Sequence, residues 1–111
     1  LEDESYAEWC CEEREVLKEM YLTTLRRLAG LYLEQSVPEK SVEAYRRALT
    51  TDPLREENHQ GLMRALWAAG RRDEALRQFQ ICREVLFREL DVGPLPETEE
   101  LSFFIREFGE R

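Results

Sequence analysis

The sequence lacks long apolar runs and contains little glycine or proline. No apolar stretch approaches the length of about 18 residues that a membrane helix needs, and no secretory signal is visible, so we expect neither. Five glycines and four prolines are distributed over 111 residues. No segment alternates apolar and polar residues as a half-buried strand would. These absences, together with an apolar fraction of 42%, predict an all-α protein with a core of its own.

Positive charge is also scarce, and it is unevenly placed. The net charge is −8. Residues 1–20 carry eight acids and two bases, and residues 89–111 carry seven acids and two bases, whereas residues 21–88 carry twelve bases and nine acids. A protein that binds the DNA backbone needs a basic surface. We therefore expect that this chain does not bind DNA directly.

Apolar residues recur at three- and four-residue steps in five segments, which predicts five helices. The first is expected to begin at Ser5, with Glu8 in the capping-box position, and to end near residue 35. Pro38 and Pro53 suit a first helical turn, and Gly70 suits a left-handed cap after a helix. The other four helices are expected at about 38–51, 53–69, 72–90 and 97–108.

The pattern of the second and fourth helices repeats after 34 residues. The matched positions pair large residues with large and small with small: Tyr45 with Phe79, Ala48 with Cys82, and Ser36 with Gly70. A helix–turn–helix unit of this period is typical of tetratricopeptide repeats. Such units stack because one pair of helices cannot bury its apolar faces alone.

These patterns together predict a tetratricopeptide-like stack of helical hairpins. We expect residues 1–111 to form one domain with repeat pairs at about 22–55 and 56–90, an extended N-terminal helix, and a C-terminal capping helix at 97–108. Because the chain begins with Leu1 rather than Met, we expect it to be a fragment of a longer protein.

Histidine and cysteine offer little material for catalysis. A cysteine nucleophile needs a histidine partner, and the only histidine, His59, matches Leu25 one repeat earlier, which predicts that it packs between helices. No glycine-rich phosphate loop is present, and adjacent acids on a helix do not face each other as an acid–base couple must. The sequence therefore predicts no enzyme and no cofactor.

A zinc site made from the three cysteines and His59 is the alternative use of these residues. Adjacent side chains on a helix point about 100° apart, so Cys10 and Cys11 are poorly placed to bind one ion. Cys82 matches Ala48 and is predicted to be a small core residue, so we expect no metal. An odd cysteine count with a vicinal pair is a poor disulfide framework and favours a reducing cytoplasm.

The inner face of the stack is the predicted interaction surface. In stacked hairpins the first helix of each pair lines the concave side, and its outward side chains are available to a partner. The predicted partner-binding residues are Arg26, Leu33, Gln60, Arg64 and Trp67. An exposed tryptophan beside arginines is typical of an interaction hot spot. The alternative is that Trp67 packs beneath a terminal helix while the arginines only keep the surface soluble.

Three segments carry a family resemblance. They are DPLREENHQGLMRAL at 52–66, AAGRRDEALRQF at 68–79 and PETEEL at 96–101. Over roughly residues 6–105 the chain resembles the bacterial transcriptional activator domain, the tetratricopeptide-like module of antibiotic-regulatory activators. The resemblance implies a regulatory module that follows a winged-helix DNA-binding domain and acts by self-association or by contact with other proteins.

Three functions stay open at this point. The first is an interaction or oligomerisation module of a cytoplasmic transcriptional activator. The second is a ligand sensor whose groove takes an anionic small molecule or peptide, because Arg26, Arg64 and Trp67 are suited to pairing and stacking. The third is a scaffold domain in a signalling protein unrelated to DNA.

Overall fold

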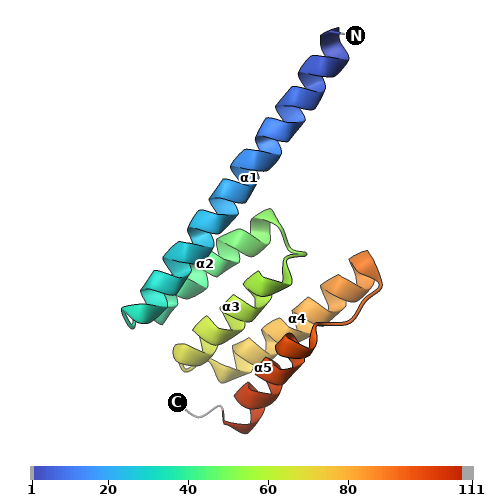
Figure 1. Cartoon of the computed structure of the whole chain (residues 1–111). Coiled ribbons are helices and arrows are strands. Elements are labelled where there is room, and N and C mark those ends of the chain that lie inside the picture. Colours follow the sequence, from blue (N-terminus) through green and yellow to red (C-terminus); the bar gives the residue numbers. More distant parts are fainter. Residues whose placement is uncertain (1, 109–111) are drawn as a thin grey trace.

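The computed structural model describes the backbone of residues 2–108 and the side chains of residues 10–108, and this part of the chain is helical (Figure 1). Its five helices are α1 (Glu2–Glu34), α2 (Pro38–Thr51), α3 (Glu56–Ala68), α4 (Arg72–Leu90) and α5 (Pro96–Glu107). The prediction of an all-α fold is confirmed. Within the described part, no helix has both the length and the hydropathy that crossing a bilayer requires.

Two helix boundaries differ from the sequence-based expectation. The first helix begins at Glu2, before the expected cap at Ser5, whose side chain lies outside the described residues. The third begins at Glu56 rather than Pro53. The carboxylate of Asp52 accepts the N–H of Leu54 at 3.2 Å and the Nε–H of Arg55 at 3.1 Å. These bonds hold residues 52–55 in a turn and delay the start of the helix.

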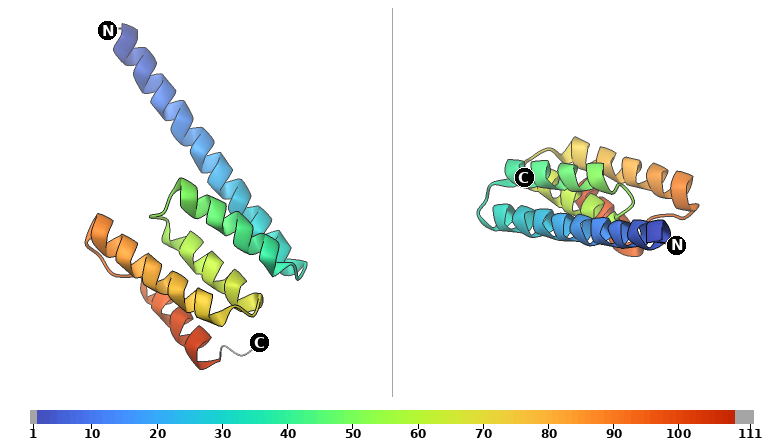
Figure 2. Two further views of the ribbon diagram at one scale, coloured as in Figure 1. Left: turned by 180° about the vertical axis from the view of Figure 1, so that it is seen from behind. Right: turned by 90° about the horizontal axis from the view of Figure 1, so that it is seen from above.

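The helices form two layers (Figure 2). α1, α3 and α5 lie side by side in one layer, and α2 and α4 lie in the other, so that the chain passes back and forth between layers. This is the arrangement of a tetratricopeptide-like stack, and the predicted fold class is confirmed. α1 continues through Gly30 as a single helix, and its first half projects beyond the stack.

The two turns between paired helices have the same geometry 34 residues apart. Ser36 has φ of 61° and Gly70 has φ of 77°, both in the left-handed region. In each turn the residue that follows donates its N–H to a carbonyl five residues earlier at 2.8 Å: Val37 to Tyr32, and Arg71 to Leu66. This is the hydrogen-bond pattern of a Schellman cap. The repeat in the sequence is therefore a repeat in backbone conformation.

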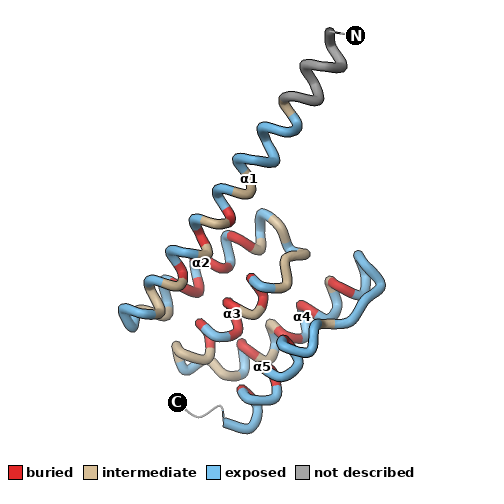
Figure 3. The backbone as a smooth tube through the Cα atoms, in the orientation of Figure 1, coloured by how far each residue is buried: buried red, intermediate tan, exposed pale blue. Residues whose placement is uncertain are grey.

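The core lies between the layers and follows the same repeat (Figure 3). Tyr45 and Phe79 are each 7% exposed, and both belong to the helices of the second layer. The ring of Tyr45 lies directly over Gly61 of α3, where an added Cβ would come within 2.3 Å of it. Leu28 breaks the symmetry, because it is 37% exposed whereas its match Leu62 is buried. The reason is its position on α1, the end of the stack, where no further helix covers it.

α5 is held at both of its ends by side chains from other helices. At its start, the carboxylate of Glu56 accepts the N–H of Leu95 at 2.6 Å and the hydroxyl of Thr98. At its end, the guanidinium of Arg72 donates to the carbonyls of Ile105 at 3.1 Å and Arg106 at 2.7 Å. An acid at the helix N-terminus and a base at the C-terminus match the helix dipole and its unpaired backbone groups.

Removing the strain at Ser36 should stabilise the protein. Ser36→Gly is expected to raise the free energy of unfolding by about 0.5–1 kcal/mol, because glycine adopts a positive φ without a steric penalty. The reciprocal change, Gly70→Ser, should lower it by a similar amount. Urea denaturation followed by circular dichroism measures both.

The control is Gly30→Ala. The added Cβ meets open space and position 30 is inside a helix, so replacing the glycine should raise the free energy of unfolding. Equal destabilisation by all three changes would contradict this account of the turns.

Candidate functional site

A groove between α1, α3 and the first turn contains three of the five predicted partner-binding residues. Leu33, Arg64 and Trp67 border a space of about 590 Å³. The rest of its lining is Ser36, Pro38 and Ala68. Leu33 and Trp67 are 34 residues apart and so occupy the same position in neighbouring hairpins. The stacking of the repeats therefore brings these two apolar side chains together.

The chemistry of the groove is apolar with one cation at its edge. Leu33 and Trp67 are half-buried and pack against the core, whereas Arg64 is exposed. Trp67 is thus half-buried rather than fully exposed, because it packs against the core and also lines the groove. Its contact with a partner stays a prediction. A half-buried aromatic ring beside an exposed guanidinium suits a partner side chain that is apolar with a carboxylate nearby.

The other two predicted residues lie outside the groove and contact neighbouring helices. The guanidinium of Arg26 on α1 forms an ion pair with Glu57 on α3 at 3.2 Å. The side-chain amide of Gln60 donates to the hydroxyl of Thr98 on α5 at 2.7 Å. Gln60 thus belongs to the contact between α3 and α5, together with Glu56, which accepts from the same hydroxyl. Whether these two side chains also contact a partner stays a prediction.

Ser36 and Pro38 are groove residues that were not among the predicted ones. They come from the turn between α1 and α2, which closes one end of the groove. The available signal was the match of Ser36 with Gly70, because a left-handed residue reverses the chain sharply and brings Pro38 back beside the end of α1. A search limited to the concave faces of helices does not find turn residues.

His59 is a structural residue of the core, as predicted. It is 2% exposed. Its Nε2–H donates to the carbonyl of Pro53 at 2.7 Å, and its Nδ1 accepts from the side-chain amide of Gln78 at 2.9 Å. Burial lowers the pKa of His59, although the bond to Pro53 acts in the opposite direction. The ring is therefore a neutral link between α3, α4 and the turn before α3.

The cysteines do not come together with His59. Cys10 and Cys11 lie on the first half of α1, and the described residues of α1 do not pack against α4, which carries Cys82. Burial raises the pKa of the Cys82 thiol to about 12, so this sulfur is a core atom rather than a thiolate. Across the described residues, no three histidine, cysteine or acidic side chains form a group suited to a metal ion.

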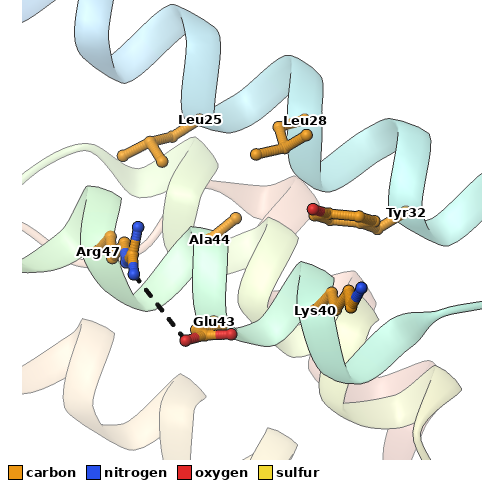
Figure 4. Close-up of a pocket in the computed structure, with 7 residues that line it drawn as sticks. All are labelled: Leu25, Leu28, Tyr32, Lys40, Glu43, Ala44 and Arg47. Atoms are coloured by element: carbon orange, nitrogen blue, oxygen red, sulfur yellow. Dashed lines mark ion pairs between the residues drawn. The ribbon is translucent and has the colours of Figure 1, made fainter.

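A second, smaller hollow lies between α1 and α2 on the side of the stack away from α3 (Figure 4). Its volume is about 210 Å³. Leu25, Leu28 and Tyr32 of α1 form one wall, and Lys40, Glu43, Ala44 and Arg47 of α2 form the other. The ammonium of Lys40 lies 5.6 Å from the centre of the Tyr32 ring, and Arg47 pairs with Glu43 at 4.0 Å. This hollow combines an apolar wall with two basic side chains.

The sequence is similar to one protein family and to known regulatory proteins. The profile of the bacterial transcriptional activator domain matches residues 1–106. Regulatory protein AfsR of Streptomyces griseus is 35% identical over 90 residues, and regulatory protein AfsR of Streptomyces coelicolor is 34% identical over 90 residues. In both cases the alignment covers 81% of this chain and 9% of the relative. No solved structure matches the chain.

The segments that carry the resemblance make the contacts between helices. In the segment 52–66, Arg55 pairs with Glu19 of α1 as well as with Asp52. Next along the chain, Glu56 binds the start of α5 and Glu57 pairs with α1. In the segment 68–79, the guanidinium of Arg71 reaches Glu39 of α2 at 2.7 Å. These residues connect α3 and its flanking turns to α1, α2 and α5.

The buried imidazole should make stability depend on pH. Because the pKa of His59 is lower in the folded protein than its ordinary value of about 6.5, the unfolded chain binds the proton more readily. Stability is therefore complete above about pH 6.5 and falls as the pH drops towards the folded-state pKa. Urea denaturation at a series of pH values measures the slope.

His59→Leu is the matched control, because leucine occupies the equivalent position, Leu25, one repeat earlier. This variant should lose the pH dependence in that window even if its overall stability is lower. A slope that persists in the variant would assign the titration to another group. The carboxylates of Asp52 and Glu74, whose pKa values are lowered, titrate at more acidic pH and do not interfere.

Proposed function

This chain belongs to the family of bacterial transcriptional activator domains, and from that premise we propose that it is the protein-binding module of a transcriptional activator. In this proposal, the groove between α1, α3 and the first turn receives a segment of a partner protein. The segment presents an apolar side chain to Leu33 and Trp67 and a carboxylate to Arg64. The observation that carries the proposal is the convergence of these three predicted residues on one groove.

DNA contact belongs to another part of the protein in this proposal. The net charge of −8 opposes binding to a phosphate backbone. The basic residues of the middle of the chain are also largely engaged: Arg26 with Glu57, Arg55 with Glu19 and Asp52, and Arg71 with Glu39 and Glu74. The chain spans only 9% of the length of its AfsR relatives, so other segments of such a protein are available for this task.

An anionic small molecule is the second candidate occupant of the groove. It would need Arg26 and Arg64 to act together, as the sequence suggested. Arg26 is already neutralised by Glu57, which leaves Arg64 as the cation at the groove. One exposed arginine beside a half-buried tryptophan supports a peptide side chain better than a multiply charged metabolite. The contacts therefore favour a protein partner.

The test places groove variants in the intact activator and measures transcription from its target promoter. Arg64→Glu and Leu33→Asp are each expected to reduce activation and partner affinity by about tenfold, because hot-spot residues each contribute on the order of 1–2 kcal/mol. Arg77→Glu, the same charge change on an exposed position of α4, is the control. Melting temperatures establish that the variants are folded. Wild-type activation by both groove variants would rule out the groove as the docking surface.

Fluorescence gives a direct readout of the groove. The chain contains two tryptophans, so Trp9→Phe leaves Trp67 as the only one. Binding of the partner should shift the emission of Trp67 to shorter wavelength, because the ring loses contact with water. The same titration with an added Arg64→Glu change should show a weaker response. Emission that is unaffected by a bound partner would place the partner on a different surface.

A further inference from the structure

The side of α1 that faces away from the stack carries exposed apolar side chains in two groups, here together called the outer stripe, with Thr24 and Arg27 between them. Its members are between 37% and 60% exposed. They are Val16, Leu17, Met20, Tyr21, Leu28 and Leu31. At about 100° per residue, Val16, Met20 and Leu31 lie opposite the buried face of α1, and Leu17, Tyr21 and Leu28 lie on the flank beside it. The buried face consists of Leu22, Leu25 and Ala29. α1 is therefore apolar on two opposite sides.

An apolar stripe at this place is unusual for a helical repeat. The terminal helix of a stack normally presents a polar outer face, because nothing of the stack covers it. The neighbouring exposed side chains of Val16, Leu17, Met20 and Tyr21 form an apolar patch of the kind that marks an interaction site. The first half of α1 projects from the stack (Figure 1), and its side chains from Cys11 to Leu17 are exposed. The geometry of the stripe thus calls for a long, straight partner such as another helix.

The charges on α1 suggest which helix that is. The first half of α1 is acidic, and the second half carries Arg26 and Arg27. On the side of the outer stripe, Glu13 and Arg27 stand seven residues before and seven residues after Met20. If two copies of α1 run antiparallel about a twofold axis at Met20, Glu13 of each copy lies beside Arg27 of the other. The dimer then contains two such pairs of opposite charge. A parallel pair would instead place acid beside acid.

We propose that the outer stripe is a self-association surface, on which α1 of a second copy of this chain packs in the antiparallel direction. A twofold contact of this kind is closed and buries Val16, Leu17, Met20 and Tyr21 of both copies at the axis. It also brings the acidic residues Glu12, Glu13 and Glu15 of each copy alongside residues 25–30 of the other. That stretch borders the hollow of Figure 4, where Lys40 supplies positive charge and Arg47 is paired with Glu43.

This inference goes beyond the proposed function and does not depend on it. The outer stripe and the groove at Trp67 are on different sides of α1, because Leu33 packs against the core whereas Leu31 is 52% exposed. A dimer formed through the outer stripe therefore leaves both grooves open. The two proposals can therefore be tested independently, because a substitution in the outer stripe should not change binding at the groove, and a substitution in the groove should not change dimerisation.

Sedimentation equilibrium of this chain, over a range of concentrations and at low ionic strength, tests the proposal. The wild type is expected to form dimers. Met20→Glu, at a 60% exposed position, places two like charges at the twofold axis and should leave the chain monomeric with an unchanged helical spectrum. Arg27→Glu should weaken the dimer by about tenfold or more, because it replaces two ion pairs with two repulsions.

The decisive variant is the charge exchange Glu13→Arg with Arg27→Glu. Each single change should weaken association, and the double change should restore it, because the two residues then pair with reversed signs. Arg77→Glu on α4 and Arg64→Glu in the groove are the controls and should leave the dimer intact. A wild-type chain that stays monomeric at all concentrations overturns the proposal. So does a dimer that the charge exchange fails to restore, or one that Met20→Glu leaves unaffected.

Discussion

The packing of each helix pair against the next is the constraint on which this structure depends. No hairpin here has enough apolar surface to form a core alone, and the contact between Tyr45 and Gly61 shows how the pairs interlock. The ring of Tyr45 occupies the space that a side chain at position 61 would fill, and α2 therefore lies close to α3. This close approach holds the two layers together, and the stacking of the repeats places Leu33 beside Trp67.

Charged residues add contacts between helices to this apolar packing. Glu56 and Arg72 bind the two ends of α5, while Arg55, Glu57 and Arg71 connect α3 and its flanking turns to α1 and α2. These contacts are partly exposed, so each one contributes little to stability. Their effect is on geometry, because they determine the order of neighbouring helices and their relative positions along the helix axes. These residues lie in two of the segments that carry the family resemblance, 52–66 and 68–79.

The sequence was sufficient for the fold because the fold is periodic. The 34-residue repeat predicted the paired turns at Ser36 and Gly70 and the matched core positions Tyr45 and Phe79, and all four residues behave as pairs. The candidate site was less predictable. The period ended before α5, so nothing indicated that Gln60 would be engaged by Thr98, and helix-face reasoning did not include the turn residue Pro38. The repeat also could not show that Leu28, although aligned with the buried Leu62, is exposed because it lies on the end helix of the stack.

The unbroken course of α1 through Gly30 has a mechanical consequence. A helix without a hinge moves as one rigid body. Its projecting half therefore moves together with the half that packs in the stack, about a point near Lys18, where an ion pair with Asp52 joins α1 to the stack. A slight rotation of α1 against α2 and α3 becomes a larger sweep at the far end. Conversely, any force applied to that end is delivered to the wall of the groove that contains Leu33. Distant parts of this small module are thereby connected by rigidity alone.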